Sequence, residues 1–337
     1  MRARVVLVHA ALLIALVVIG GLAVSLGSVR LPLDQVWRIV LEPVVPWIDA
    51  DWTRVRAAIV WDSRMPRVVT GIVVGAALAL SGAIAQLVTA NPMADPYLLG
   101  VSEGAGFAAS LVMVLGVGAG ALGLPVAAFL GGLLALVVVL AVAGRSGSVT
   151  TLVLGGLAVG QVAYAATSLV LHVFATGDQT KQVLFWITGG LGAARWESLP
   201  VPAAVLVIGL IAAVAAGRWM NVLHGGDDAA AALGLNARAF RMACLVGISL
   251  LAGTAVAVAG GIVFVGLLVP HAATFLVGAE ARRMLPVSAL LGAVFLVLAD
   301  LAARLVIAPS ELPVGVLTAM VGGPLFLIML RRQRRIA

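Results

Sequence analysis

The sequence predicts an all-α integral membrane protein with about ten transmembrane helices in a single domain over residues 1–337. Of these residues 63% are hydrophobic and 10% are charged, and the mean hydropathy is +1.18, far from the proportions of soluble domains. Apolar runs of roughly 18 or more residues, long enough to cross about 30 Å of hydrocarbon, recur along the chain. Many of the 39 glycines, such as the pair in GIVVG at 71–75, are spaced for close contact between helices.

Ten apolar runs define the predicted helices. The first follows Arg2 and Arg4 and is similar to a secretory signal, but its apolar core is too long, so we favour a retained helix. Two pairs of neighbouring runs are separated only by turns that contain glycine, so each pair could be merged or split. The predicted spans are 5–27, 68–89, 98–118, 121–143, 149–174, 198–217, 242–260, 262–279, 285–305 and 313–330.

The basic residues indicate the orientation of these helices. An even number of spans puts both termini on one side, where twelve positive charges fall, among them Arg145 and those of the tail RRQRR at 331–335. The other side carries nine, of which six lie in residues 28–67 beside five acidic residues. We therefore expect both termini in the cytoplasm, residues 28–67 mostly outside at the membrane interface, and residues 218–241 on the cytoplasmic face.

Several function classes are excluded by what the sequence lacks. No stretch matches the P-loop pattern G-x-x-x-x-G-K-[ST], and Lys181 is the only lysine. Cys244 is the only cysteine, so the chain forms no internal disulfide and no thiolate metal cluster. The four histidines are isolated in sequence, and the arginines are scattered without forming a basic face. We expect no catalytic residues, no metal or cofactor bound by this chain, and no nucleic-acid partner.

Ionisable residues inside apolar spans would indicate ion-coupled transport, because each is costly in hydrocarbon unless it is paired or hydrated. Glu103 lies near the start of the third span. Asp300 and Arg304 stand one helical turn apart and can pair with each other. Since no chain of buried carboxylates follows, a proton- or sodium-driven carrier is the weaker alternative.

The segment HGGDDAAAALGLNARAFR, residues 224–241, is too polar to span the membrane. Asp227 and Asp228 favour the positive end of a short helix, the alanines propagate it, and Gly234 can end it with a left-handed cap. Asn236 can cap a second turn. A helix of roughly seven residues is about 10 Å long, which suits a peg in a groove of another protein. The alternative is an ordinary helix in a surface loop.

Three long motifs resemble a known family. RMPRVVTGIVVGAALALSGAIAQLVTANPMADPYLLGVSEGAG at 64–106, GGIVFVGLLVPH at 260–271 and LADLAARLVIAPSELPVGVLTAMVGGPLFLIML at 298–330 are similar to the iron-chelate, haem and vitamin B12 permeases of bacterial ABC importers. With residues 225–241, the resemblance covers most of the chain. It implies the type II importer permease fold and a multi-pass protein of the inner membrane, in contact with lipid. Its implied partners are a second copy of this chain, two cytoplasmic ATPase subunits that hold ATP and Mg²⁺, and a periplasmic substrate-binding protein.

The resemblance also implies which residues carry the function. The fifth helix, 149–174, would line the translocation pathway, where the alternative is that its polar groups only bond to neighbouring helices. The helix within 224–241 would couple to the ATPase. The implied pathway residues are Gly160, Gln161, Tyr164, Thr167, Ser168 and His172, and the implied coupling residues are Asp227, Asp228, Ala230, Ala231, Leu233 and Gly234.

Three arginines are implied to dock the binding protein from outside. Arg64 and Arg67 begin the second helix at its outer end, and Arg304 lies near the outer end of the ninth. Arginine suits this role because its planar fork holds a carboxylate by two contacts. The alternative is local pairing, of Arg64 with Asp62 and of Arg304 with Asp300.

The cargo implied by the resemblance is a ferric siderophore, haem or cobalamin. We favour an iron compound, haem first, because IVWDSRMPR at the start of the second helix is similar to the haem permeases. Trp61 in that string could instead be an interface anchor. Among the histidines, His172 is the one to test as a haem contact. Cobalamin is the alternative cargo.

Overall fold

The computed structural model describes residues 2–333 except 28, 30, 46, 119–122, 144–148 and 309. Helices are the only regular elements of the described residues, which contain no strand, and this confirms the predicted fold class. The helices are α1 (Arg2–Ser25), α2 (Leu33–Leu41), α3 (Arg54–Ala58), the π-helical η1 (Ile59–Arg64), α4 (Met65–Thr89), the 3-10 turn η2 (Pro96–Leu99), α5 (Val101–Leu115), α6 (Gly123–Ala143), α7 (Val149–Phe174), α8 (Gly177–Ile187), the 3-10 turn η3 (Trp196–Ser198), α9 (Pro200–His224), α10 (Asp227–Ala232), α11 (Ala237–Ala259), α12 (Val265–Val277), α13 (Ala281–Leu305) and α14 (Val314–Gln333).

An apolar helix occupies each of the ten predicted spans. Seven helical segments are long and apolar enough to cross a membrane, and three apolar helices are shorter, namely α5, α12 and the apolar part of α14. Glycines shorten α5, because Gly100 and Gly116 at its two ends have positive φ angles of 71° and 68°. The pairs of runs that could have merged are separate helices.

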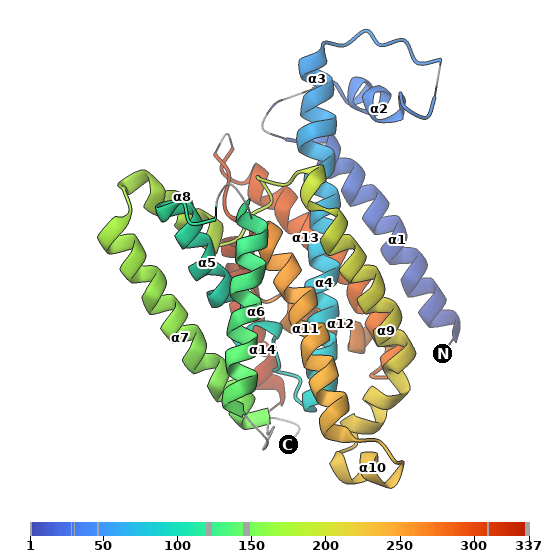
Figure 1. Ribbon diagram of the computed structural model, residues 1–337. Helices are drawn as coiled ribbons and strands as arrows, with labels where there is room; N and C mark the ends of the chain where they lie inside the picture. The colour runs from blue at the N-terminus through green and yellow to red at the C-terminus, as the bar shows by residue number, and fades with distance from the viewer. Residues whose placement is uncertain are drawn as a thin grey trace.

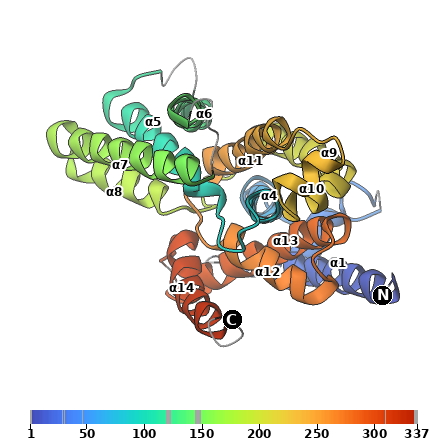
Figure 2. The same cartoon turned by 90° about the horizontal axis from the view of Figure 1, so that it is seen from below.

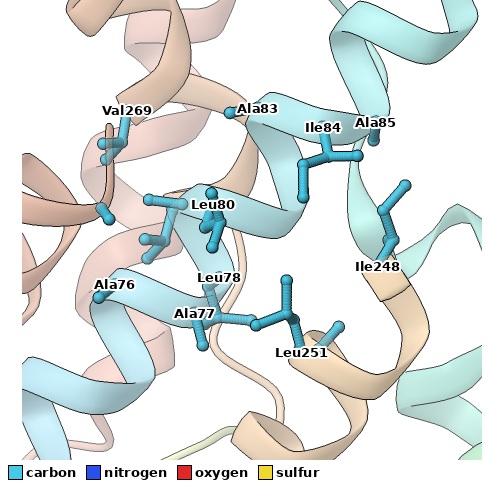
Figure 3. Close-up of a cluster of buried hydrophobic side chains, with 14 of the residues drawn as sticks. Ala76, Ala77, Leu78, Leu80, Ala83, Ile84, Ala85, Ile248, Leu251 and Val269 are labelled. Carbon is cyan, nitrogen blue, oxygen red and sulfur yellow. The ribbon is translucent and has the colours of Figure 1, made fainter. Parts of the chain in front are cut away.

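The helix α4 lies at the centre of the bundle. It packs against α9, α11, α12 and α13, which surround it in the view of Figure 2. Figure 3 shows the middle of this core, where Leu78 and Leu80 of α4 lie among side chains that include Leu251 of α11 and Val269 of α12. The apolar side chains of α4 are therefore buried against the protein itself, and lipid is excluded from them.

Glycines allow the neighbours of α4 to approach it closely. A Cβ on Gly75 would collide with the Gly292 carbonyl of α13, and a Cβ on Gly82 would collide with the backbone of Gly266 in α12. These contacts bring helix backbones together without side chains between them, as small residues do in membrane bundles. Gly75 belongs to the GIVVG motif, so its predicted role in helix packing is confirmed.

A side chain of α4 also donates hydrogen bonds to backbone carbonyls of α12 that have lost their helical partner or lie next to one. Pro270 lies inside α12 and has no N–H, so the carbonyl of Gly266 loses its helical partner. The Gln86 amide donates to the carbonyls of Gly266 at 3.5 Å and Leu267 at 3.0 Å. Both carbonyls are buried in the bundle, where water cannot replace the lost bond, so Gln86 stabilises the contact between the two helices.

The helix that contains α4 begins earlier than predicted. The helical segment runs from Arg54 to Thr89, 36 residues, instead of starting at 68. At 1.5 Å per residue this is about 54 Å, longer than a bilayer core. Its first turns therefore project beyond the bundle beside α2, at the top of Figure 1. Trp37 and Trp47 of this region are exposed, as predicted for residues at a membrane interface.

The two ends of the bundle carry different elements. The start of α1, the end of α14 and α10 lie at one end, which we call the proximal end, and α2 and α3 lie at the opposite, distal end (Figure 1). The first residues of α1 and the last residues of α14 therefore lie at the same end of the bundle as the 224–241 segment. The positive charges of Arg30, Arg145, Arg334 and Arg335, which entered the prediction of orientation, lie outside the described residues.

Candidate functional site

The helix α10 projects from the proximal end of the bundle (Figure 1). Asp227 and Asp228 form its first turn, Gly234 follows it with a φ of +74°, and the Asn236 side chain accepts from the amide of Ala239 at 3.0 Å to begin α11. All three features match the sequence prediction. The helix has six residues, and the Arg241 guanidinium anchors it by an ion pair of 2.6 Å with Asp227.

The exposed face of α10 differs from the predicted one at a single residue. Ala230 is 0% exposed and packs into the core of the bundle, so it cannot touch another protein. Ala231 is exposed, and the Leu233 side chain is 61% exposed just after the helix. The sequence could not distinguish Ala230 from Ala231, because the face turned toward the bundle depends on how α10 packs against α9 and α11.

Two cavities follow one face of α7. The first, of about 430 Å³, lies beside Gly156, Gly160 and Gln161 of α7, and the segment 93–98, residues 263–267 and Phe326 of α14 complete its lining. The second, of about 450 Å³, continues toward the distal end between α5, α7 and α8. Its α7 lining is Tyr164, Thr167, Ser168, Leu171 and His172. From Gly156 to His172, a distance of 16 helical steps, these cavities extend about 24 Å along α7.

All six residues of α7 that the sequence resemblance singles out line one of these cavities. The alternative from the sequence is that the polar side chains of α7 only bond to neighbouring helices, and the hydrogen bonds of Thr167 and His172 can be compared with it. The Thr167 hydroxyl donates to the Ala163 carbonyl at 2.9 Å, and the Nδ1 atom of His172 lies 2.8 Å from the Ser168 carbonyl. Both bonds stay within α7. Gln161, Tyr164 and His172 are exposed on this chain.

Glu103 connects the two cavities, because its side chain lines both. The sequence shows it only as an ionisable residue at the start of a span. Tyr97, Phe264 and Phe326 also line the first cavity, and the sequence patterns did not indicate them. The Tyr97 hydroxyl donates to the carbonyl of Ile262 at 3.1 Å. Phe264 has a backbone φ angle of +68°, a value that residues other than glycine rarely adopt. These residues meet through tertiary packing of distant segments.

Asp95 lies beside the first cavity, in the connection between α4 and α5. Its carboxylate accepts from the amide of Tyr97 at 2.8 Å and caps η2. Burial disfavours the charged form and raises the pKa of Asp95 to about 6, although the amide of Tyr97 acts in the opposite direction and nearby Glu103 adds to the rise. Among the described residues, no group of three or more His, Cys, Asp or Glu side chains could hold a metal ion.

At the distal end, two arginines donate hydrogen bonds to the backbone carbonyls at the end of α1. The last carbonyls of a helix have no partner within it. Arg64 donates to the carbonyls of Val24 and Ser25, each at 2.8 Å, and to that of Val29. Arg304 donates to the carbonyls of Ala23 at 3.1 Å and Leu26 at 3.2 Å. Their positive charges also lie where the helix dipole is negative, so they fix α1 to α4 and α13.

The third arginine joins α4 to α13 and to the segment after it. Arg67 donates to the Asp300 carboxylate from Nε at 3.0 Å and Nη2 at 2.9 Å, and from Nη1 to Glu311 at 2.8 Å. The Asp300 carboxylate also lies 3.1 Å from Nε of Arg304, so the predicted pair of these two residues is confirmed. Asp300 therefore holds both arginines, and none of the ion pairs of the described residues joins Arg64 to Asp62.

These contacts correct the expectation of an exposed arginine surface. Arg64, Arg67 and Arg304 are only 5%, 9% and 3% exposed, and their guanidinium groups are bonded within the chain. The sequence placed them at the correct end of the bundle. It could not show that α1 ends beside Arg64 and Arg304, because that contact joins residues about 40 and 280 positions apart.

Comparison with known proteins decides the family. The sequence profile of the FecCD transport family matches residues 12–332, nearly the whole chain. The chain belongs to the FecCD transport family. The hemin transport system permease protein HmuU of Yersinia pestis is 36% identical, over 96% of this chain and 95% of its own length. The iron(3+)-hydroxamate import system permease protein FhuB of Bacillus subtilis is 37% identical, over 93% of this chain and 80% of its own.

Two further similarities agree with this assignment. The cobalamin import system permease protein BtuC of Halobacterium salinarum is 41% identical, over 81% of this chain and 73% of its own length. A solved structure assigned to the metal-chelate type of ABC transporter, in an inward-facing conformation, superposes with a TM-score of 0.82 and 28% identity over 96% of this chain and 98% of that chain. This FecCD protein is therefore a multi-pass permease subunit of a bacterial ABC importer, a class that works with ATPase subunits and a substrate-binding protein.

Proposed function

We propose that two copies of this chain form a conduit in the bacterial inner membrane that imports an iron compound, either haem or a ferric siderophore, with cobalamin as the alternative cargo. The observation that carries this proposal is the pair of cavities along α7, whose outward side is exposed. A second copy facing α7 would enclose the cavities between two subunits. Apolar side chains exposed on α7 and α14 support such a contact, among them Leu157 and Leu325.

The energy for transport is proposed to come from the partner subunits. ATP and Mg²⁺ bind there, and their closure moves α10, which then changes the helices around the pathway. A ligand shifts such an equilibrium only through its different affinity for the two states. The support is the position of α10 at the proximal end, with an exposed Leu233 and an ion pair that ties it to α11. This end would face the cytoplasm.

The proposal is tested by uptake into liposomes that contain the chain with its ATPase and a loaded binding protein. We expect uptake of haem, a ferric trihydroxamate or cobalamin that requires ATP and stops when the ATPase is omitted. The matched control is the same chain alone in liposomes with a proton or sodium gradient. Uptake driven by that gradient would contradict the proposal and support the ion-coupled carrier.

The role of α10 is tested by two exposed substitutions, Ala231→Arg and Leu233→Asp. Both residues lie outside the bundle, so the thermal stability of the purified chain should stay within about 0.5 kcal/mol. Copurification with the ATPase should fall, because a close-packed contact does not accept a bulky charge. Ala230→Arg is unsuitable, since it would disturb the packing of α10 itself. If copurification persists, the contact lies elsewhere, for example in residues 90–97 or 279–284.

Docking of the binding protein is proposed at the distal end. Because Arg64, Arg67 and Arg304 are buried, a docking role for them would require acidic residues of the binding protein to replace their present acceptors. Reversal of Arg64 and Arg67 would also disrupt α1, so it cannot isolate docking. Arg54 and Arg195 are exposed at the distal end. Their reversal to Glu should weaken docking most at low salt if exposed charge supplies the attraction. Unchanged docking would leave the buried arginines as the candidates.

A further inference from the structure

The two cavities along α7 have an unbalanced charge. Glu103 lines both, and Asp95 lines the first beside it. Among the described residues that line these cavities there is no Lys or Arg. The remaining lining is apolar, aromatic or uncharged, apart from His172 near the distal end of the second cavity. A cargo that moves along α7 would therefore pass a negative charge with no fixed positive charge beside it.

Glu103 is placed by the fold to face this space. It lies in the first turn of α5, and its carboxylate rests against α7 at Gly160, where Cγ and Oε2 lie 3.5 Å from the position a Cβ would take. None of the ion pairs of the described residues includes it. The first turn of a helix is a favourable place for an acid, which supplies a structural reason for its presence there. That reason does not account for its position between the two cavities.

We propose that Glu103 is a specificity-determining residue that selects metal chelates of neutral or positive charge against chelates that carry free carboxylates. This inference rests on the proposed function, because it takes the cavities as the pathway. Ferric iron bound by three hydroxamates is neutral, since each hydroxamate carries one negative charge. Haem carries two propionates and would be repelled. The charge of the cavities thus favours a hydroxamate chelate or cobalamin over haem. The sequence, by contrast, predicts haem first.

The magnitude of the effect follows from Coulomb's law. The interaction energy of two unit charges about 8 Å apart is about 0.5 kcal/mol at an effective dielectric constant of about 80 and about 2 kcal/mol at about 20. These energies change a rate or an affinity about twofold and about thirtyfold, respectively. We expect about fivefold, because the cavities are open to water on the side of α7. Neutralising Glu103 should therefore change the preference between a cationic and an anionic cargo without abolishing transport.

The test measures uptake by the complete complex, reconstituted with its ATPase and binding protein, for two series of probes. The first is a linear ferric trihydroxamate with its terminal amine free, acetylated or succinylated, which makes it positive, neutral or negative at similar size. The second is cobalamin and its derivative with one side-chain amide hydrolysed to a carboxylate. Haem is measured beside them. The wild-type complex should favour the positive and neutral probes.

The variants then assign this preference to one residue. Glu103→Gln should reduce the ratio of positive to neutral probe about fivefold, Glu103→Lys should reverse it, and Glu103→Asp should keep it. Glu42→Gln removes the same charge from an exposed residue of the distal segment, away from the cavities, and should leave the ratio unchanged. Because every variant uses the same binding protein, the selectivity of that protein cancels in the comparison.

Two results would overturn the inference. One is a Glu103→Lys complex that keeps the wild-type preference for the positive probe. The other is a charge ratio that is the same in wild type and in Glu103→Gln. Failure of the wild-type complex to take up any probe with ATP would instead contradict the proposed function, so the two failures are distinguishable. Glu103→Lys, compared with the wild type on the same binding protein, keeps the inference testable if Glu103→Gln does not assemble.

Discussion

The helices α4 and α7 have similar length and are both strongly apolar, yet they occupy opposite environments. In the most apolar stretch of the segment that contains α4, 89% of the residues are buried, and in that of α7 only 17% are. Figure 2 shows the difference directly, with α4 enclosed by other helices and α7 at the edge of the bundle. Hydropathy reports that a helix avoids water. It does not report whether protein, lipid or another subunit covers it.

The comparison separates two uses of polar and small residues. On α4, Gln86 and Arg67 complete bonds that the bundle itself requires, and the glycines bring backbones together. On α7, Thr167 and His172 bond only to their own helix, and Gln161 is exposed. Changes on α4 should therefore act on stability, and changes on α7 should act on transport.

The largest effect is expected from Arg67→Met, at the start of α4. Removing this guanidinium leaves Asp300 with one arginine and Glu311 with none, and breaking a buried ion pair costs about 3–5 kcal/mol. Thermal unfolding in detergent measures the loss. The control is Arg38→Met, whose pair with Asp51 is exposed and should contribute less than about 1 kcal/mol. Equal stability of the two variants would show that the distal network is not structural.

A second test compares glycines on the two helices. Gly82→Ala places a Cβ against the Gly266 backbone and should destabilise the bundle by about 3 kcal/mol, since backbone cannot move aside as a side chain can. Gly155→Ala on α7 meets only a side-chain methyl of Val139 at 3.7 Å. It should be neutral or stabilising by up to about 1 kcal/mol through helix propensity. Both are measured by unfolding, and a destabilised Gly155→Ala would count against the contrast.

Two glutamines provide the next pair. Gln86→Leu should cost about 1–3 kcal/mol, because it removes the donor to the Gly266 and Leu267 carbonyls beside Pro270. Within the described residues the exposed Gln161 side chain makes no hydrogen bond, so the stability of Gln161→Leu should differ from that of the wild type by less than about 0.5 kcal/mol. Uptake by the reconstituted complex should change in Gln161→Leu instead. A variant at 161 that unfolds earlier but transports normally would reverse the assignment of the two helices.

The last prediction concerns the pH dependence of stability and Asp95, in the connection between α4 and α5. Burial raises the pKa of Asp95 to about 6. Between about pH 4 and pH 6 the Asp95 carboxyl is therefore protonated in the folded chain and ionised in the unfolded chain. Its contribution to stability is fully present below the unfolded pKa of about 4 and is lost as the pH rises through about 6. Asp95→Asn keeps the cap on η2 and should flatten this part of the pH profile. An unchanged slope in the variant would assign the titration to another group.

The sequence by itself determined the class of protein and the ten apolar helices, and it placed the start of the first helix and the end of the last at the same end of the bundle. It also located the short helix at 227–232 with its glycine and asparagine caps, because capping depends on residues a few positions apart. The motifs at 64–106, 260–271 and 298–330 were long enough to indicate the family. These features are local, so neighbouring residues specify them without reference to the rest of the chain.

Only the tertiary structure decided which side chains are available to a partner or a cargo. Arginines at the end of a span suggest an exposed charge, but Arg64 and Arg304 are buried because the unpaired carbonyls of α1 reach them from a distant part of the chain. Ala230 and Ala231 are adjacent residues of the same type, and packing buries the first and leaves the second exposed. Glu103 faces two cavities because α5 and α7 pack together there. Such contacts join residues that are far apart in sequence, and the periodicity of a single helix carries no record of its neighbours.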